Sequence, residues 1–194
     1  VRVRVSLCVC VRPQAQHAMS LCVFDFDHTL IEENSDTEVV RLLGGPEALQ
    51  ELRSLYKQPP FQGAWIDLMN HMHKQLHARG VTPPQYQDAL QTMRVDAELV
   101  ALLRGEGEVR LPSPIHIVSD ANTLYIRSIL RASGLSLEEQ ATLLRVHTNS
   151  AHWEGGDTAS PTHQQEEEEG RWGEEKAQAA GVVVETAAGV EGVE

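Results

Sequence analysis

The chain has 194 residues, a formal net charge of −12 and a sequence pI near 5.2. This length is enough for one domain with a buried core and an inserted subdomain. The acidic balance argues against a nucleic-acid partner, because no basic stripe is available to meet phosphates. No apolar run approaches the ~18 residues of a membrane-spanning helix, so we expect no membrane partner either. Nothing in the sequence indicates an oligomeric state.

The negative charge is concentrated at the C-terminal end. Residues 151–194 hold 11 acids and two bases, a net of −9, whereas residues 1–150 hold 17 acids and 14 bases, a net of −3. The last segment repeats Gly, Ala, Val and Glu and has no periodic apolar face, which is typical of a disordered tail. We therefore predict an acidic low-complexity tail over residues 151–194.

The first 18 residues alternate valine with polar and basic residues, and the first methionine is Met19. We interpret residues 1–18 as a disordered or artefactual extension. The three cysteines, Cys8, Cys10 and Cys22, form neither a disulfide framework nor the spacing of a zinc knuckle. Free thiols are typical of a reducing compartment, so the cytoplasm is the expected location.

The folded part is predicted to begin with a buried strand at residues 20–25, a short apolar run that ends in polar residues. Ser35 and Glu38 have the spacing of a capping box, which predicts that a helix begins there. Gly44-Gly45-Pro46 is expected to end this helix and to open the next one. Further helical patterns follow at residues 46–57, 63–79, 84–93 and 95–104.

A second strand is predicted at residues 115–118, followed by a helix that ends at Gly134, and a weaker third strand at residues 143–147. Strands that alternate with helices indicate a parallel α/β sheet. Between the first two strands the chain has roughly 60 residues more than one crossover needs, all with helical patterns. This excess predicts an all-helical cap at residues 37–104, with the α/β core formed by residues 19–36 and 105–150.

Two aspartates come directly after the first strand. Asp25 and Asp27 are spaced i, i+2, so both carboxylates can face one ligand at the carboxyl end of the strand, where open α/β sheets bind ligands. Carboxylates this close repel each other unless a cation intervenes, and Mg²⁺ accepts carboxylate, carbonyl and phosphate oxygens. Ser119 has the matching place after the second strand, where its hydroxyl can bind a phosphoryl oxygen or cap the next helix.

These segments carry a family resemblance. VFDFDHTL and IVSDAN resemble motifs I and II of the haloacid-dehalogenase-like phosphatases. DFDHTLIEENSD together with SDAN is similar to the phosphoethanolamine/phosphocholine phosphatase and pyridoxal-phosphate phosphatase group, which has plant pyrophosphatase-like relatives. The resemblance covers about residues 20–150. It implies a Rossmann-like parallel sheet with a helical cap, and a Mg²⁺-dependent phosphatase that acts on a small phosphorylated metabolite.

The resemblance also implies a role for each matching residue. Asp25 would be the nucleophile that forms an aspartyl-phosphate, and a direct Mg²⁺ ligand. Asp27 would be the general acid/base and would bind the metal through its main-chain carbonyl. Thr29 would support the motif I loop, and Ser119 would bind the phosphoryl group.

Two more aspartates, Asp36 and Asp120, fall where the family places substrate-contacting acids. Two acids near the leaving group would favour an amine-bearing substrate, such as phosphoethanolamine or phosphocholine, over a sugar phosphate. In the alternative interpretation, Asp36 is a first-turn acid that satisfies the helix dipole.

Two features that the resemblance implies have no match after Ser119, namely a motif III lysine and a motif IV segment GDGxxD. The only lysine after Lys74 is Lys176, and Asp157 follows no apolar strand. Without them the affinity for Mg²⁺ and the rate of phosphoryl transfer would fall, because this reaction depends on positioning and electrostatics. The first strand would also become a sheet edge. The chain is interpreted as truncated after motif II. A non-catalytic binding fragment and an inorganic pyrophosphatase on the same scaffold are the alternatives.

The predicted helix at 63–79 carries two patterns outside this chemistry. Its histidines are predicted to form a polar cap face, with metal or substrate contact as the alternative: His71, His73 and His77. Its apolar stripe is predicted to be cap core: Trp65, Leu68, Met69 and Met72.

Overall fold

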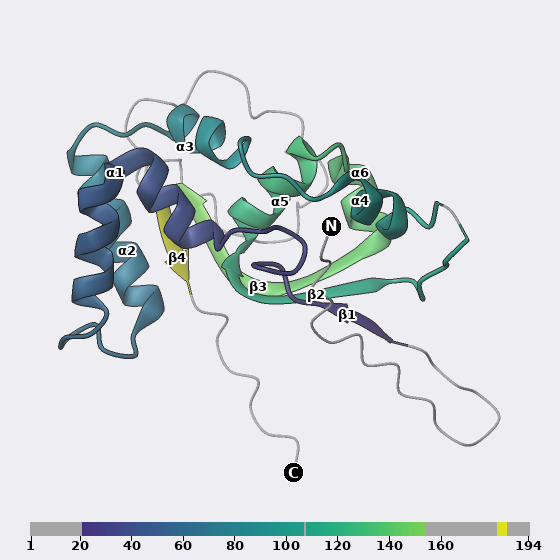
Figure 1. The fold of residues 1–194 in the computed structure, drawn as a ribbon, viewed down its shortest axis with the longest axis horizontal. Coiled ribbons are helices and arrows are strands. Elements are labelled where there is room, and N and C mark those ends of the chain that lie inside the picture. Colours follow the sequence, from purple (N-terminus) through teal and green to yellow (C-terminus); the bar gives the residue numbers. More distant parts are fainter. Residues whose placement is uncertain (1–20, 107, 154–181, 186–194) are drawn as a thin grey trace, which may run out of the picture.

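The computed structural model describes residues 21–106, 108–153 and 182–185, the last of these by backbone alone. These residues form an α/β fold in which helices pack against a four-stranded sheet (Figure 1). The predicted extension at 1–18, Asp157 and most of the predicted tail lie outside the described residues.

The sheet has the strand order β1-β2-β3-β4. The strands β1 (Cys22–Phe24), β2 (Ile115–Asn122) and β3 (Leu144–Trp153) run parallel, and β4 (Val182–Glu185) pairs antiparallel with β3. The parallel sheet predicted from the sequence is therefore confirmed. Within the described part of the chain β1 is an edge strand, as the sequence also predicted.

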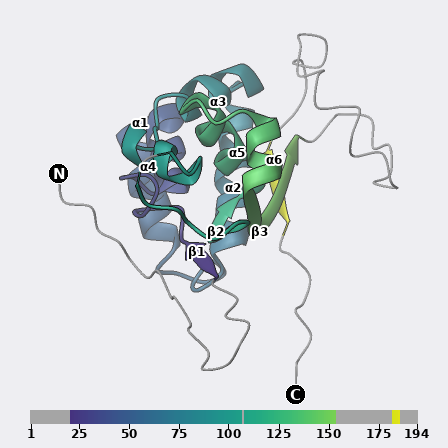
Figure 2. The same ribbon diagram turned by 90° about the vertical axis from the view of Figure 1, so that its right-hand side faces the viewer.

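Four helices lie between β1 and β2 in the sequence, which confirms the all-helical insertion, and two follow β2. Figures 1 and 2 show α3 to α6 on one side of the sheet, with α1 and α2 packed together beyond its end. No described helix has both the length and the apolarity to cross a membrane. The bounds are α1 (Ser35–Leu55), α2 (Trp65–Ala78), α3 (Pro83–Leu90), α4 (Ala97–Leu103), α5 (Thr123–Ala132) and α6 (Leu137–Leu143).

Helix α1 contains both of the helices predicted at its position. Gly45, with φ of 79° and ψ of −178°, interrupts it just before Pro46, so the chain bends there. This region of backbone space is essentially restricted to glycine, because it has no Cβ to clash. The predicted break is thus a kink between two helical segments.

The capping box predicted at Ser35 is wrong. Asn34 is the N-cap of α1, and its side chain accepts the N–H of Thr37. Ser35 is fully buried and donates its hydroxyl to Asp27, eight residues earlier. The spacing of Ser35 and Glu38 could not indicate that the buried carboxylate of Asp27 would take the Ser35 hydroxyl in place of the helix N-terminus.

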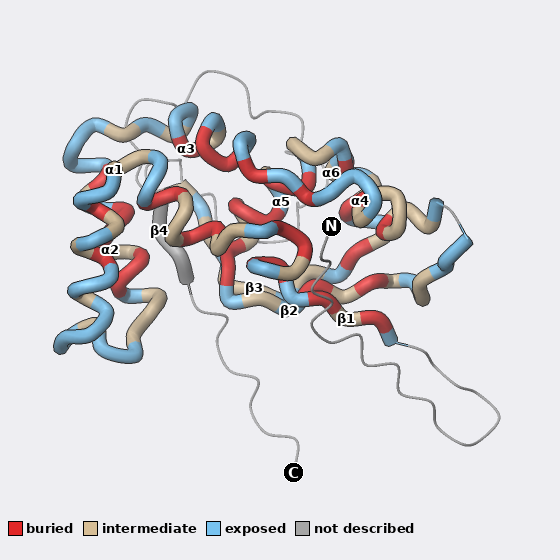
Figure 3. Tube along the Cα trace, viewed as in Figure 1, coloured by how far each residue is buried: buried red, intermediate tan, exposed pale blue. Residues whose placement is uncertain are grey.

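Buried side chains fall into two hydrophobic clusters (Figure 3). The smaller one lies between α1 and α2, and it confirms the predicted cap core: Val40, Ala48, Leu52, Leu68, Met69 and Met72, with Trp65 packed against them. The larger cluster surrounds the sheet and α5, and it also includes Tyr86 and Leu103, which α3 and α4 contribute. The second half of the predicted cap region therefore shares the core of the sheet.

The sheet extends past the predicted boundary at Ser150. Strand β3 continues through Trp153, and Val182–Glu185 pairs with it, so these two short stretches of the predicted tail belong to the sheet. Helix α6 is not among the helices predicted from the sequence. Its capping box, Ser136 with Glu139, was the sequence signal that could have found it.

Candidate active site

The chain turns sharply after β1. The Phe26 carbonyl accepts main-chain N–H groups from residues 29–31, and His28 adopts a left-handed φ of 57°. This turn leaves Asp25 exposed at the end of the strand and places Asp27 inside, where it is only 5% exposed. The two carboxylates that follow β1 thus have different surroundings.

Asp27 lies against the N-terminus of α1. Its Oδ1 accepts the Ser35 N–H at 3.1 Å, and its Oδ2 accepts from Ser35 Oγ at 3.3 Å and from Asn34 Nδ2 at 3.0 Å. Burial raises the pKa of Asp27 to about 6, although the hydrogen bonds from Ser35 act to lower it. A carboxyl group with this pKa exchanges its proton near neutral pH, which suits a general acid/base.

Asp36 is buried in the first turn of α1. Its Oδ2 accepts the indole N–H of Trp65 at 2.8 Å. Burial raises the pKa of Asp36 to about 7, the hydrogen bond from Trp65 lowers it, and the charges of Asp27 and Asp120 raise it further. The carboxylate joins the first turns of α1 and α2, a contact that the sequence did not predict.

Ser119 and Asp120 lie in the irregular last part of β2, where the register with β3 shifts. The Ser119 Oγ accepts the N–H of Ala121 at 3.2 Å, which leaves the hydroxyl hydrogen available to a ligand. Asp120 is exposed, and its carbonyl accepts from Asn149 Nδ2 at 3.0 Å. The cap of α5 is Asn122 rather than Ser119, since the Asn122 side chain accepts the N–H at the third helical position.

The structure brings four carboxylates together, each within electrostatic reach of at least one other. Asp25 and Asp120 both act to raise the pKa of Asp27, and Asp27 and Asp120 both act to raise that of Asp36. None of the ion pairs among the described residues involves any of these four groups. A cation bound here would therefore relieve their repulsion.

Comparisons with known proteins identify the family of the chain. A sequence family described as "Putative Phosphatase" matches residues 20–166. The chain belongs to this family. Together with its motifs, the match places it among the haloacid-dehalogenase-like phosphatases.

Three relatives illustrate the range of the family. Human phosphoethanolamine/phosphocholine phosphatase is 31% identical over 114 residues, covering 59% of this chain and 41% of the relative. Arabidopsis thaliana inorganic pyrophosphatase 2 is 34% identical over 113 residues, covering 58% and 37%. Bos taurus pyridoxal phosphate phosphatase is 32% identical over 113 residues, covering 58% and 45%. The chain spans less than half the length of these relatives.

A solved structure, a phospho-aspartyl intermediate analogue of phosphoserine phosphatase, matches with a TM-score of 0.37 and 16% identity, over 70% of this chain and 57% of that one. This likeness is too distant to add to the family assignment.

The side chains of motif I do not by themselves make a metal site. Among the described residues, no three His, Cys, Asp or Glu side chains lie close enough together to hold an ion by themselves. Asp25 is exposed and its Oδ1 accepts the N–H of Phe26. Mg²⁺ commonly uses one or two carboxylates, and water and substrate phosphate complete its shell. The exposed Asp25 carboxylate fits Mg²⁺ as part of such a donor set.

The predicted polar cap face is wrong for one of its histidines. His73 is fully buried, with Nδ1 3.1 Å from the Tyr86 hydroxyl and Nε2 3.4 Å from the Tyr125 hydroxyl. Burial lowers the pKa of His73 to about 4, so the ring is neutral at pH 7. Through these two tyrosines, His73 links α2 to α3 and α5. His77 is exposed, as a polar face requires, and His71 is half-buried beside Phe61.

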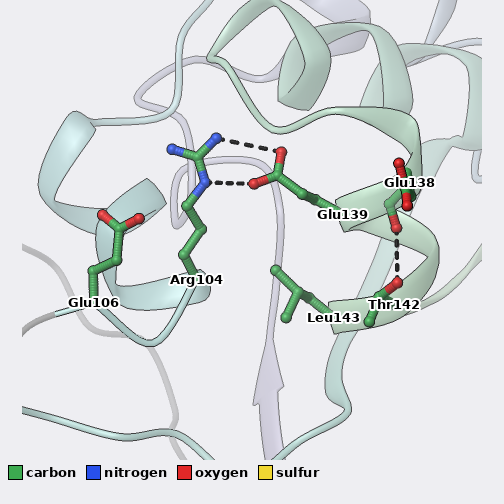
Figure 4. Close-up of a pocket in the computed structure, with 6 residues that line it drawn as sticks. All are labelled: Arg104, Glu106, Glu138, Glu139, Thr142 and Leu143. Atoms are coloured by element: carbon green, nitrogen blue, oxygen red, sulfur yellow. Dashed lines mark hydrogen bonds and ion pairs between the residues drawn. The ribbon is translucent and has the colours of Figure 1, made fainter.

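A surface depression between α4 and α6 shares no residue with the phosphatase motifs (Figure 4). Arg104 donates to Glu139 there at 2.8 Å, and this bond, with the Ser136 N–H, holds the pKa of Glu139 at about 2. Arg104, the one cationic residue that lines this depression, is therefore already paired. The lining residues are Arg104, Glu106, Glu138, Glu139, Thr142 and Leu143.

Proposed function

We propose that this chain carries the nucleophile and phosphate-binding part of a Mg²⁺-dependent phosphatase that hydrolyses a small phosphomonoester. One observation carries the proposal: Asp25 and Asp27 follow β1, Ser119 and Asp120 lie near the end of the neighbouring parallel strand β2, and the charges of the aspartates influence one another. The names of the relatives support the reaction class and point to phosphoethanolamine, phosphocholine or pyridoxal phosphate as substrates.

In the proposed reaction an oxygen of Asp25 attacks phosphorus and the bond to the leaving oxygen breaks, which gives an aspartyl-phosphate. The Asp27 carboxyl donates its proton to the leaving oxygen. Water then attacks phosphorus, Asp27 takes up a proton from it, and the bond between phosphorus and Asp25 breaks. Ser119 donates its hydroxyl hydrogen to a phosphoryl oxygen, and Thr29, whose N–H bonds the Phe26 carbonyl, supports the loop.

Mg²⁺ would be held by the Asp25 carboxylate and the Asp27 carbonyl. When bound, it neutralises charge on the phosphoryl group and on the aspartates. Exposed Asp120 is the better placed of the two predicted substrate acids, because Asp36 is buried and already bonded to Trp65. We therefore assign recognition of an amine-bearing leaving group first to Asp120.

The test is release of inorganic phosphate by the full chain with Mg²⁺ and phosphoethanolamine, phosphocholine or pyridoxal phosphate. Asp25→Asn removes the nucleophile, so activity should fall to background. The matched control is Asp88→Asn, an exposed aspartate on α3, which should keep wild-type activity. Equal rates for wild type and Asp25→Asn would exclude the aspartyl-phosphate route.

The same assay separates the two alternatives. Faster phosphate release from pyrophosphate than from any monoester would favour a pyrophosphatase, which the plant relative supports. A folded chain that binds phosphoethanolamine in calorimetry but releases no phosphate would be a binding fragment, and the enzyme proposal would fail for this chain.

A further inference from the structure

Two histidines on neighbouring strands meet on the outer face of the sheet, apart from the phosphatase motifs. The imidazole of His116 on β2 and that of His147 on β3 are parallel within 3°, with ring centroids 5.1 Å apart. His116 Nδ1 lies 2.9 Å from His147 Nε2. The register pairs His147 with Val118, so the two histidines are diagonal neighbours across the strands.

The pleat of β2 turns this pair towards solvent. Ile115 and Ile117 are buried in the core, whereas His116 and Val118 alternate with them on the other face, where Val118 is 51% exposed. Helices α5 and α6 contact the opposite face, as Figures 1 and 2 show. His147 is exposed, so an ion in solution can reach the pair.

The contact between the two rings brings one nitrogen of each imidazole to the same place on the surface. An N–H···N bond needs one nitrogen that carries hydrogen and one bare lone pair, and these two point at each other. A metal ion there would take the place of the shared hydrogen. That hydrogen would be replaced by one on the far nitrogen of the same ring through exchange with solvent, so both rings would bind as neutral imidazoles with no net loss of a proton. With Zn–N distances of 2.0–2.1 Å and tetrahedral geometry, the nitrogens would be about 3.3 Å apart. The two nitrogens would need to separate by a few tenths of an ångström, and the rings would need to tilt so that both lone pairs face the ion.

We propose that His116 and His147 form a binding site for a divalent transition metal of the Zn²⁺, Ni²⁺ or Cu²⁺ class, with water in the remaining positions. Imidazole nitrogen suits these ions, whereas Mg²⁺ prefers oxygen ligands, so the site is separate from the one proposed at Asp25.

Arg145 is the cationic side chain of β3, the strand that carries His147. Its guanidinium is already bonded elsewhere, because it donates to the carbonyls of Ala141 and Leu144 near α6.

The site has a consequence for stability. Because each strand contributes one ligand, an ion that binds the folded sheet and has no such pair in the unfolded chain shifts unfolding by mass action. Zn²⁺ should therefore raise the melting temperature, and the rise should depend on both histidines.

The test is calorimetric titration of Zn²⁺ and of Ni²⁺ into the full chain that carries Asp25→Asn, with excess Mg²⁺ present. This background removes the motif I carboxylate, so failure of the phosphatase proposal would not affect the result. We expect one ion per chain. His116→Gln and His147→Gln should each weaken binding by about tenfold or more and abolish the Zn²⁺-dependent rise in melting temperature.

The matched control is His152→Gln, which changes another exposed histidine of β3. It should bind Zn²⁺ like the parent. Unchanged binding in both His116→Gln and His147→Gln would overturn the proposal. An equal loss in all three variants would also overturn it, because it would indicate diffuse binding to surface histidines.

Discussion

At the scale of single residues, Asp27 and Asp36 differ from ordinary surface acids in one respect. Both are buried, and burial raises the pKa of Asp27 to about 6 and that of Asp36 to about 7. At neutral pH the ionised forms oppose folding, because the unfolded chain solvates them better. Carboxyl groups with pKa values perturbed by burial cluster at functional sites.

Of these two groups, Asp36 has the larger rise in pKa and therefore the larger contribution to the pH dependence of stability. Because its folded-state pKa lies above the ordinary 3.8, the folded protein binds more protons than the unfolded chain between pH 3.8 and about 7. The stability associated with this group is complete at low pH and is lost as pH rises through that window.

We therefore predict that Asp36→Asn is more stable than wild type at pH 8, on the order of 2 kcal/mol, because the neutral amide needs no charge solvation and can still accept from Trp65. The gain should shrink towards pH 4.5. Urea unfolding in EDTA at both pH values measures it, with exposed Asp88→Asn as the control. A variant less stable than wild type at pH 8 would contradict the assignment.

At the scale of elements, the kink in α1 lets one helix serve two purposes. Its first turns hold Ser35 and Asp36 in the site, and its later turns pack on α2. Gly44 and Gly45 make the bend possible. A Cβ on Gly44 would lie 2.4 Å from the Ala48 Cβ, and Gly45 has a positive φ of 79°.

Gly45→Ala should lower the free energy of unfolding by roughly 1–3 kcal/mol, since alanine is strained in that backbone region. Denaturant unfolding measures the loss. The control is Arg53→Ala on the exposed face of the last turn of α1, where a change within about 0.5 kcal/mol is expected. If Gly45→Ala were as stable as wild type, the kink would not depend on glycine.

At the scale of the whole molecule, the sheet presents β1 as an edge within the described residues. Cys22 and Phe24 are buried, whereas Val23 lies half-buried between them. An apolar edge strand is a template for pairing with another chain. The apolar edge favours self-association, whereas the acidic net charge of the chain opposes it.

Val23→Lys should reduce self-association without unfolding the protein, because a lysine on an edge strand disfavours pairing between sheets. Light scattering over a concentration series measures the effect, and circular dichroism verifies the fold. Val109→Lys, at a valine that is 61% exposed in a loop, makes the same charge change away from the edge. Equal improvement in both variants would indicate that net charge, and not the edge, is responsible.

The sequence by itself determined the strand just before Asp25, the start of the strand that carries Ser119, the helical insertion between them, and the family. Each depends on local patterns: apolar runs, helical spacing and motif residues. Only the tertiary structure decided that Asp36 binds Trp65, 29 residues away, that His73 lies buried between two tyrosines, and that Val182–Glu185 completes the sheet. These contacts join residues far apart in the chain, and the burial that sets their pKa values and partners exists only once the whole core has formed.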